Sequence, residues 1–360
     1  MTTIRSLRDC LINPQVIYPG RETHLPCAFV YSNEAEFDPV WAGHIVANAY
    51  RERTAISDAV MIGRLPAGAM LRGGDHFLLC VDGAAIADYI PHVFRENTAA
   101  LGAELKNERA VIEIREEFVL LARYGHGTWG HWMGEILPIA AAVEAAYPGR
   151  FRYAVPQSGH VDYVTGMIQS LALYGISIQR LVWLRSGFDH RFHRALAVTP
   201  IWSDSAPHPA ALDALRKVIP NDPQGPKKIA LMRRDSLTRA IANAAEVQDV
   251  LVGEGFYITD MAGVRFAQQL RAFSGADVVF GVLGSGLTGL IYSPDYIRVI
   301  AASPSGFSDR FFYALVQRRG GRWVEVKGRS LWNGRDGLLR DAPFEIPIRA
   351  LREALAAIAG

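Results

Sequence analysis

The spacing of hydrophobic and polar residues changes near residue 130. Before it, short β-type runs are separated by the turn sequences PAG, GGD and VDG, which predicts a strand-rich segment over residues 1–120. After it, runs with helical spacing alternate with short apolar runs, a pattern typical of a parallel sheet covered by helices. The elements predicted up to residue 198 are strands at 60–65, 77–81, 110–121, 151–155, 181–184 and 195–198 and helices at 131–146 and 161–174.

A second alternating region follows the segment IPNDPQGPKK at 219–228, which is rich in Pro, Gly and polar residues and is the predicted linker. Its predicted elements are strands at 229–232, 256–259, 277–281, 297–302 and 323–326 and helices at 244–254, 266–274, 308–317 and 346–358. We therefore predict an α/β protein in which two Rossmann-like domains face a cleft. The predicted boundaries are 1–218 (strand-rich to residue 120, then α/β), 228–343 (the second domain) and 344–360 (a C-terminal helix).

The sequence DVVFGVLGSGLTGLIYSP (277–294) is the leading candidate for a binding site. It predicts a buried strand, a turn with Gly281, Gly284 and Gly286, and a short apolar helix that starts near Leu287. Backbone N–H groups and the positive end of a helix dipole would then lie at a strand's carboxyl end, where open α/β sheets bind ligands, and phosphate is the ligand favoured there. A glycine turn that only packs a helix close to a strand is the alternative.

The glycine spacing argues against several related classes of site. It is G-x-x-G-x-G, unlike the G-x-G-x-x-G of dinucleotide-binding folds, and the strand predicted next ends without an acidic residue for a ribose hydroxyl. Ser285 is not in a nucleophile elbow, because Leu283 occupies the position of the first glycine. The chain also has no P-loop sequence.

Arginines gather after the first strand that follows the linker. Arg233 and Arg234 lie at its end, and Arg239 and Asn243 lie in the loop that leads to the next helix. Arginine at the carboxyl end of a parallel strand points into the ligand crevice, and its fork of donors suits diphosphate oxygens. A basic surface loop is the alternative. Gln269 is a candidate for binding a base or a sugar, with an amide on a helix surface as the alternative.

His131 and Glu135 form a second candidate site. They are four residues apart in TWGHWMGEILPIA (128–140), so they share one face of the predicted helix. A carboxylate beside an imidazole suits general-base chemistry, because each group tunes the proton affinity of the other. Ordinary capping or core hydrogen bonds are the alternative.

Composition limits the classes of partner and compartment. The chain has 360 residues, of which 50% are hydrophobic and 21% charged, and its net charge of +2 includes no long basic run, so nucleic-acid binding is disfavoured. Three cysteines, an N-terminus without a signal-peptide core and no apolar run of ~18 residues predict a cytoplasmic protein. Peripheral association with the inner face of the plasma membrane stays open. The chain has neither D-x-D nor H-E-x-x-H, so no metal site is predicted.

Three blocks, in order between about 129 and 320, together resemble glycosyltransferase family 61, which includes capsular-polysaccharide enzymes and eukaryotic xylosyl- and N-acetylglucosaminyltransferases. The family patterns are H-W-L-x-[DE]-x-L-P, then S-R-R…R…N-E-x-E, then H-G-A-G-L-T-N. The matching residues here are HWMGEILP at 131–138, then Arg233, Arg234, Arg239, Asn243 and Glu246, then LGSGLTG at 283–289. Leu283 stands at the family's histidine and Gly289 at its asparagine.

The resemblance implies a GT-B fold and an inverting transfer of a hexosyl or pentosyl unit from a nucleotide-sugar, expected to be a UDP-sugar, to a hydroxyl of a glycan acceptor. Glu135 would be the general base, with His131 as the second candidate. The donor would be bound by Arg233, Arg234, Arg239, Asn243, Gln269, Gly284, Ser285, Gly286 and Leu287. No cofactor or metal is expected beside the donor, and the implied setting is capsule or exopolysaccharide assembly on a glycan or lipid-linked oligosaccharide held by the N-terminal domain.

Two other functions stay open at this point. The first alternative is a catalytically silent family member that binds a nucleotide or a glycan and acts as a partner subunit. The second is a nucleotide-sugar epimerase or reductase, which would need a bound dinucleotide. Self-association of the chain stays open as well.

Overall fold

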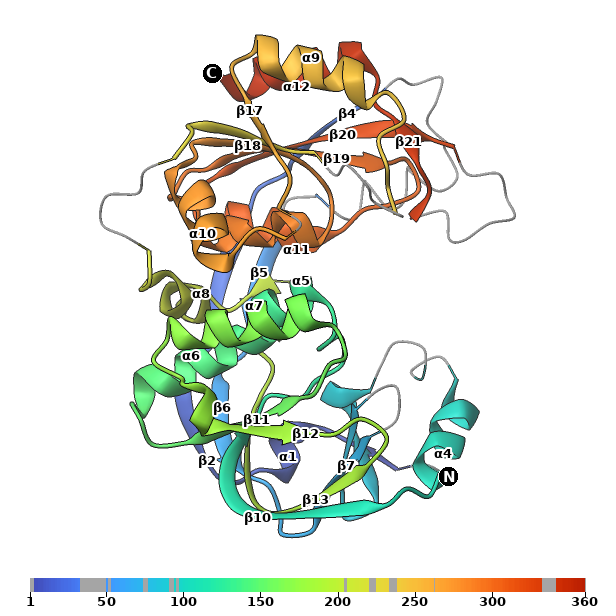
Figure 1. The fold of residues 1–360 in the computed structure, drawn as a ribbon, viewed down its shortest axis with the longest axis vertical. Coiled ribbons are helices and arrows are strands. Elements are labelled where there is room, and N and C mark those ends of the chain that lie inside the picture. Colours follow the sequence, from blue (N-terminus) through green and yellow to red (C-terminus); the bar gives the residue numbers. More distant parts are fainter. Residues whose placement is uncertain are drawn as a thin grey trace. The chain divides into compact units, whose positions relative to one another are not determined.

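The computed structural model is a mixed α/β protein, as the sequence predicts, with two compact units (Figure 1). Unit 1 comprises Met1–Arg21, Ser57–Ser203 and His208–Val218, and unit 2 comprises Glu22–Ile56, Asp204–Pro207 and Ile219–Gly360. The structure describes residues 3–32, 50, 53–73, 77–90, 94, 97–203, 206–219, 225–232, 238–261, 263–331 and 341–359. No helix within these ranges is long and apolar enough to cross a membrane. The Rossmann-like character of the domains and their facing across a cleft stay predictions.

Unit 1 is built on a mixed sheet. Its path is β1-β9-β8-β7-β13-β10-β11-β12, and β6, which also pairs with β2, joins it through β13. The strands are β1 (Ile4–Arg5), β2 (Ile12–Tyr18), β6 (Val60–Arg64), β7 (Ala69–Gly73), β8 (Phe77–Val81), β9 (Ala84–Ile86), β10 (Val111–Leu120), β11 (Arg152–Pro156), β12 (Leu181–Leu184) and β13 (Asp189–Val198). The pairings among β13, β10, β11 and β12 are parallel, whereas β6, β7 and β8 pair antiparallel.

Helices connect the parallel strands of unit 1. The chain runs from β10 through α5 (Trp129–His131), a π-helical turn (Trp132–Ile136) and α6 (Leu137–Ala146) to β11, and from β11 through α7 (Val161–Ala172) to β12. The other helices are α1 (Leu7–Cys10), α4 (Thr98–Lys106) and α8 (Pro209–Arg216). Residues 137–143 of α6 are all buried. A helix buried over this much of its surface has no polar stripe, which explains its run of Leu, Ile, Ala and Val.

Unit 2 contains a largely parallel sheet with the path β17-β16-β18-β19-β20-β21, and β4 also pairs with β20. Its strands are β4 (Phe29–Tyr31), β16 (Lys228–Leu231), β17 (Tyr257–Thr259), β18 (Val278–Val282), β19 (Arg298–Pro304), β20 (Arg322–Ser330) and β21 (Phe344–Glu345). β3 (Arg21–Leu25) and β5 (Arg53–Ser57) form a separate pair. Because β16 has β17 on one side and β18 on the other, the chain changes direction across the sheet at β16. In open parallel sheets, ligands bind beside the carboxyl ends of the strands at such a switch point.

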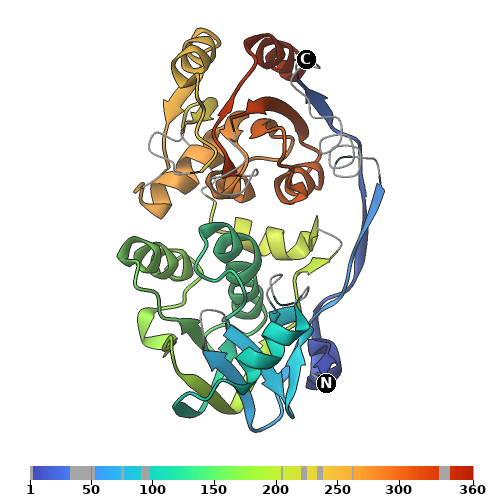
Figure 2. The ribbon, with the colours of Figure 1, turned by 90° about the vertical axis from the view of Figure 1, so that its right-hand side faces the viewer.

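Helices cover both faces of the unit 2 sheet. Figures 1 and 2 show α9 (Ala244–Gly253) and α12 (Ile348–Ala359) on one face, and α10 (Phe266–Gly275) and α11 (Arg310–Gln317) on the other. The apolar side chains of α9 and α12 form one buried cluster with the strands. The segment 22–56 belongs to this unit because β4 continues the sheet beside β20.

Most predicted elements are confirmed within the described residues. The strands predicted at 60–65, 77–81 and 110–121 are β6, β8 and β10, and the alternation after residue 130 is the succession of helices and parallel strands in both units. The strand predicted at 195–198 is longer, Asp189–Val198, because its polar first half pairs with β7 and β10. Residues 220–224 of the predicted linker lie outside the described residues.

Candidate functional site

The first candidate site lies in unit 1, where the chain leaves the carboxyl end of β10. The loop 121–128 leads into a continuous helical segment, 129–146, made of α5, the π-helical turn and α6. His131 ends α5, and Glu135 lies in the π-helical turn. The structure therefore brings the predicted pair to the sheet edge at which parallel α/β sheets bind ligands.

Proline explains the π-helical turn. Pro138 has no N–H, so it cannot donate to the carbonyl of Gly134 four residues earlier, and its ring would clash with that carbonyl in a regular α-helix. The helix widens at Trp132–Ile136, and the Gly134 carbonyl accepts a 2.6 Å hydrogen bond from the indole N–H of Trp202. Trp132 is buried and donates its own indole N–H to Ser170 of α7 at 2.9 Å. π-helical turns are frequent at functional sites, and this one holds Glu135.

His131 and Glu135 are in direct contact. Nδ1 of His131 lies 2.6 Å from Oε1 of Glu135, and the two side chains are 39% and 29% exposed. Gly125, with φ of +79°, packs against the imidazole so closely that a Cβ there would lie 2.5 Å from two ring atoms. The ring of Tyr124 lies 5.9 Å from the imidazole between centroids. The imidazole is thus fixed by a carboxylate on one side and by the 121–128 loop on another, while the pair stays open to solvent.

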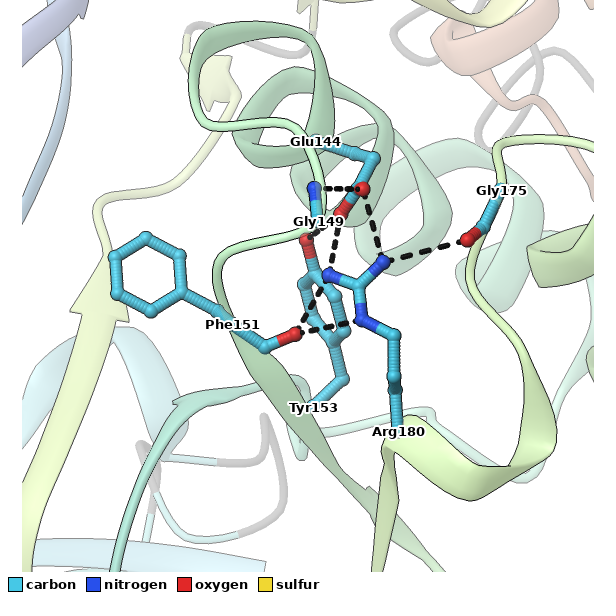
Figure 3. A network of polar contacts seen from close by, with 6 residues as sticks. All are labelled: Glu144, Gly149, Phe151, Tyr153, Gly175 and Arg180. Atoms are coloured by element: carbon cyan, nitrogen blue, oxygen red, sulfur yellow. Dashed lines mark hydrogen bonds and ion pairs between the residues drawn. The ribbon is translucent and has the colours of Figure 1, made fainter.

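A polar network anchors the far end of the same helix (Figure 3). The carboxylate of Glu144 in α6 accepts hydrogen bonds from both terminal nitrogens of Arg180, at 2.9 and 2.8 Å. It also accepts one from the backbone N–H of Gly149 at 2.7 Å and one from the hydroxyl of Tyr153 at 2.8 Å. Arg180 also donates to the carbonyl of Phe151 at 2.9 and 2.6 Å. The network joins α6 to the amino ends of β11 and β12, so it fixes the helix from the end opposite the histidine–glutamate pair.

The second candidate site lies in unit 2, at the carboxyl end of β18. The predicted turn and helix are confirmed, with Gly284 (φ +147°) preceding a 3₁₀ helix over Ser285–Tyr292. Ser285 and Gly286 are half-buried and begin this helix, whose first N–H groups have no partner within the helix. A side chain at Gly286 would meet nothing within 4 Å. There is thus room beside Gly286 for a neighbouring group, and anion binding by the N–H groups of this turn stays a prediction.

Two other glycines of the segment serve packing. A Cβ at Gly281 would lie 2.8 Å from the buried side chain of Leu287, and a Cβ at Gly289 would lie 2.0 Å from the ring of Phe273 in α10. The packing hypothesis is therefore confirmed for Gly281 and Gly289, and the binding hypothesis stays a prediction for Gly284 and Gly286. Leu287 itself is fully buried, so within this segment its side chain supports the turn from inside.

Arg239 lies against the same turn. Its terminal Nη2 would be 3.2 Å from a Cβ at Gly284, and its guanidinium carbon lies 4.7 Å from the centroid of the Phe307 ring. The backbone of Arg239 has φ of +56° and donates its N–H to the carbonyl of Asp341 at 2.9 Å. The segment 239–243 is held in this way along 341–346, which places the guanidinium beside the 3₁₀ helix start. The structure therefore brings the guanidinium of Arg239 beside the Gly284 turn, and both contribute positive charge or N–H dipoles to one candidate site.

The other predicted donor-binding residues are placed differently. Asn243 exchanges two hydrogen bonds with the backbone of Ile346, at 2.9 and 3.0 Å, so its amide fastens 341–346 to the start of α9. Gln269 donates to the carbonyl of Val264 at 2.7 Å and so braces the loop before α10. Arg233 and Arg234 lie outside the described residues.

Sequence reasoning did not identify Gly125 or Phe307. Gly125 lies in a loop whose turn residues carry no sign of an imidazole contact, and Phe307 follows β19 in a loop sixty-eight positions after Arg239. Both contacts are tertiary, so local patterns carry no signal for them. Within the described ranges, no group of three or more His, Cys, Asp and Glu side chains is arranged to hold a metal ion.

Most residues of the two candidate sites lie within a region that matches a known protein family. Residues 129–300 match the model of a protein family described as Glycosyltransferase 61. The matched region includes His131, Glu135, Arg239 and Gly284, and it ends before Phe307. Comparison with curated proteins gives no significant match.

Proposed function

The chain belongs, through residues 129–300, to glycosyltransferase family 61, and on this premise we propose that it transfers a sugar with inversion from a nucleotide-sugar to a hydroxyl of a glycan acceptor. The observation that carries the proposal is the 2.6 Å contact between His131 and Glu135 at the carboxyl end of β10, inside the matched region. Inversion needs one in-line displacement, in which the acceptor oxygen bonds to the anomeric carbon as the bond to the leaving diphosphate breaks. A base must take the acceptor proton in that step.

The contact supports the pair acting as one catalytic unit. If Nδ1 of His131 donates its proton to Glu135, Nε2 is the ring nitrogen that accepts a proton, and the carboxylate stabilises the imidazolium that forms. If Glu135 takes the proton itself, as the resemblance implies, His131 holds the carboxylate in place through the same contact. The fixed ring position next to Gly125 supports the first assignment, and we propose His131 Nε2 as the base with Glu135 orienting it.

The donor diphosphate would be bound in unit 2. The guanidinium of Arg239 and the N–H groups that start the 3₁₀ helix after Gly284 converge beside β18, next to the switch point of the sheet. Positive charge placed where the diphosphate gains charge stabilises the transition state. We propose that no divalent ion takes this role and that no cofactor is needed; a UDP-sugar is the expected donor, and capsule or exopolysaccharide assembly in the cytoplasm is the expected setting.

The decisive experiment compares Glu135→Gln with wild-type protein. Turnover of nucleotide-sugars is measured against pH in the presence of excess chelator, and affinity for UDP is measured in parallel by titration calorimetry. We expect turnover to fall about a hundredfold, because the imidazole loses the carboxylate that orients it and stabilises its charged form, with unchanged affinity. His131→Ala should lower turnover further, because it removes the proposed base itself.

Comparison of the two variants separates the assignments. If Glu135→Gln retains partial turnover with an altered pH profile while His131→Ala does not, Nε2 of His131 is the base. Near-normal turnover of both variants would refute the catalytic assignment and leave the ordinary hydrogen-bonding explanation. The catalytically silent alternative would be favoured if the protein binds UDP tightly but neither transfers a sugar from any nucleotide-sugar nor slowly hydrolyses one.

A further inference from the structure

A lysine and a glutamate are buried together in the middle of β20 in unit 2. Glu325 and Lys327 are two residues apart, so their side chains lie on the same face of the strand. Both side chains are 0% exposed, and Lys327 Nζ lies 2.5 Å from Glu325 Oε1. Ser303 of β19, the register partner of Lys327, donates to Glu325 Oε1 at 2.6 Å and accepts from Lys327 Nζ at 2.9 Å.

Stability alone does not explain this buried pair. Two charges lose their hydration when they are buried, and apolar residues of similar volume often give an equally or more stable protein. Burial lowers the pKa of Lys327, and the adjacent Glu325 opposes that shift. Burial, followed by the charge of Glu325, also raises the pKa of the neighbouring Tyr50 well above its ordinary value. Because burying this ion pair costs desolvation free energy, its presence is better explained by a role other than stability.

Lys327 ties the loop after β19 to the sheet. Its ammonium donates to the backbone carbonyl of Phe307 and, at 2.8 Å, to the hydroxyl of Ser308. The next residue, Asp309, caps α11 by accepting the N–H of Phe311 at 2.9 Å. The short loop is therefore fixed by the buried ammonium on one side and by the helix start on the other.

The anchored loop reaches the proposed donor site through the ring of Phe307. Arg239 stacks over this ring at 4.7 Å, and the same guanidinium lies against Gly284. A cation that rests on an aromatic face loses freedom at its terminal nitrogens, so the ring preorganises the arginine. We propose that Lys327 is a positioning residue for the donor: through Phe307 it holds Arg239 beside the Gly284 turn, where a nucleoside diphosphate binds. This role rests on the proposed function of unit 2.

The test is nucleoside-diphosphate affinity in folded variants, measured by titration calorimetry with UDP, GDP and ADP as probes. Lys327→Met alone would leave a buried carboxylate without its partner, so the main variant replaces the pair together, Glu325→Leu with Lys327→Met. We expect it to fold and to bind the preferred nucleotide about tenfold more weakly. Phe307→Leu, which removes the aromatic face and keeps most of the volume, should cause a similar loss.

Coupling to Arg239 distinguishes positioning from a general effect. Added to Arg239→Ala, the paired substitution should cause no further loss of affinity, because the group that it positions is gone. Glu144→Leu with Arg180→Met is the matched control, since it replaces a largely buried ion pair of unit 1 by apolar residues in the same way. It should leave nucleotide affinity unchanged.

The outcomes separate this inference from the proposed function. Wild-type affinity in the folded paired variant, or a loss that adds fully to that of Arg239→Ala, would overturn the role of Lys327 while the donor site stands. If wild-type protein binds none of the three nucleotides, the donor site itself is refuted, and the role of Lys327 with it.

Discussion

Removal of Arg180 tests how far the helix that carries His131 and Glu135 depends on its distal anchor. The substitution Arg180→Ala deletes both hydrogen bonds to Glu144 and the two to the carbonyl of Phe151. The paired side chains are only 19% and 12% exposed, so solvent does little to screen the loss. Breaking a buried ion pair costs about 3–5 kcal/mol, and the donors from Gly149 and Tyr153 that remain on Glu144 reduce this, so we expect a loss of about 2–4 kcal/mol near neutral pH.

The pH dependence of the stability loss in Arg180→Ala tests whether the charge of Glu144 causes that loss. Burial alone would raise the pKa of Glu144, but the hydrogen bonds from Arg180 and then from Gly149 and Tyr153 outweigh it and lower the pKa below its ordinary value of 4.5. A carboxyl group with a lowered pKa in the folded state adds stability above its unfolded pKa, and that stability is lost as pH falls through the folded pKa. The difference between wild type and Arg180→Ala should therefore be full at neutral pH and should shrink below about pH 4.5.

The assay must isolate unit 1, because a protein with two compact units need not unfold in one step. Urea unfolding followed by circular dichroism is combined with hydrogen exchange, measured by mass spectrometry, of peptides that cover residues 137–184. The matched control is Glu144→Leu with Arg180→Met, which removes both charges and should be more stable than Arg180→Ala. A deficit below about 1 kcal/mol at neutral pH, or one that persists unchanged when Glu144 is protonated, would refute the reasoning.

Two further predictions concern glycines. Gly125→Ala should lower turnover by about tenfold to a hundredfold and leave nucleotide affinity unchanged, because a Cβ there would lie 2.5 Å from the ring of His131; normal turnover would show that this glycine does not set the imidazole position. Gly289→Ala should lower the free energy of unfolding by about 1–3 kcal/mol, measured by thermal and urea unfolding, because its Cβ would lie 2.0 Å from the Phe273 ring; wild-type stability would refute that close packing.

The periodic elements could be predicted because their signals are local. The apolar strand β18 and the amphipathic helix α12 carry their patterns within a dozen residues, and the structure has both. The π-helical turn could not be predicted from periodicity, although Pro138 marks the point at which a regular helix fails. Its form depends on Trp202, which supplies the partner for the freed carbonyl of Gly134 from a distant part of the chain.

The candidate sites also contain some features with a local sequence signal and others that depend on tertiary contacts. The spacing of His131 and Glu135 predicts that they share a helical face, and the structure brings them into contact. The pair Glu325 and Lys327, by contrast, reads in the sequence as the solvent face of a strand, because alternate charged positions usually lie there. It is buried because the loop after β19 closes over it and supplies the carbonyl of Phe307 and the hydroxyl of Ser308 as partners for the ammonium.

Leu283 shows how a departure from a family pattern can be understood in physical terms. The residue stands where the resemblance expects histidine, and here it is fully buried, with its backbone N–H bonded to the carbonyl of Ala302 at 2.8 Å. A buried imidazole would need partners for both ring nitrogens, whereas a leucine needs none and packs the start of the turn. The positive groups of the proposed donor site are Arg239 and the N–H groups after Gly284, which do not depend on the side chain at 283. The loss of that histidine is therefore compatible with donor binding, and the nucleotide affinity of Leu283→His beside that of Arg239→Ala would show which of the two positions governs it.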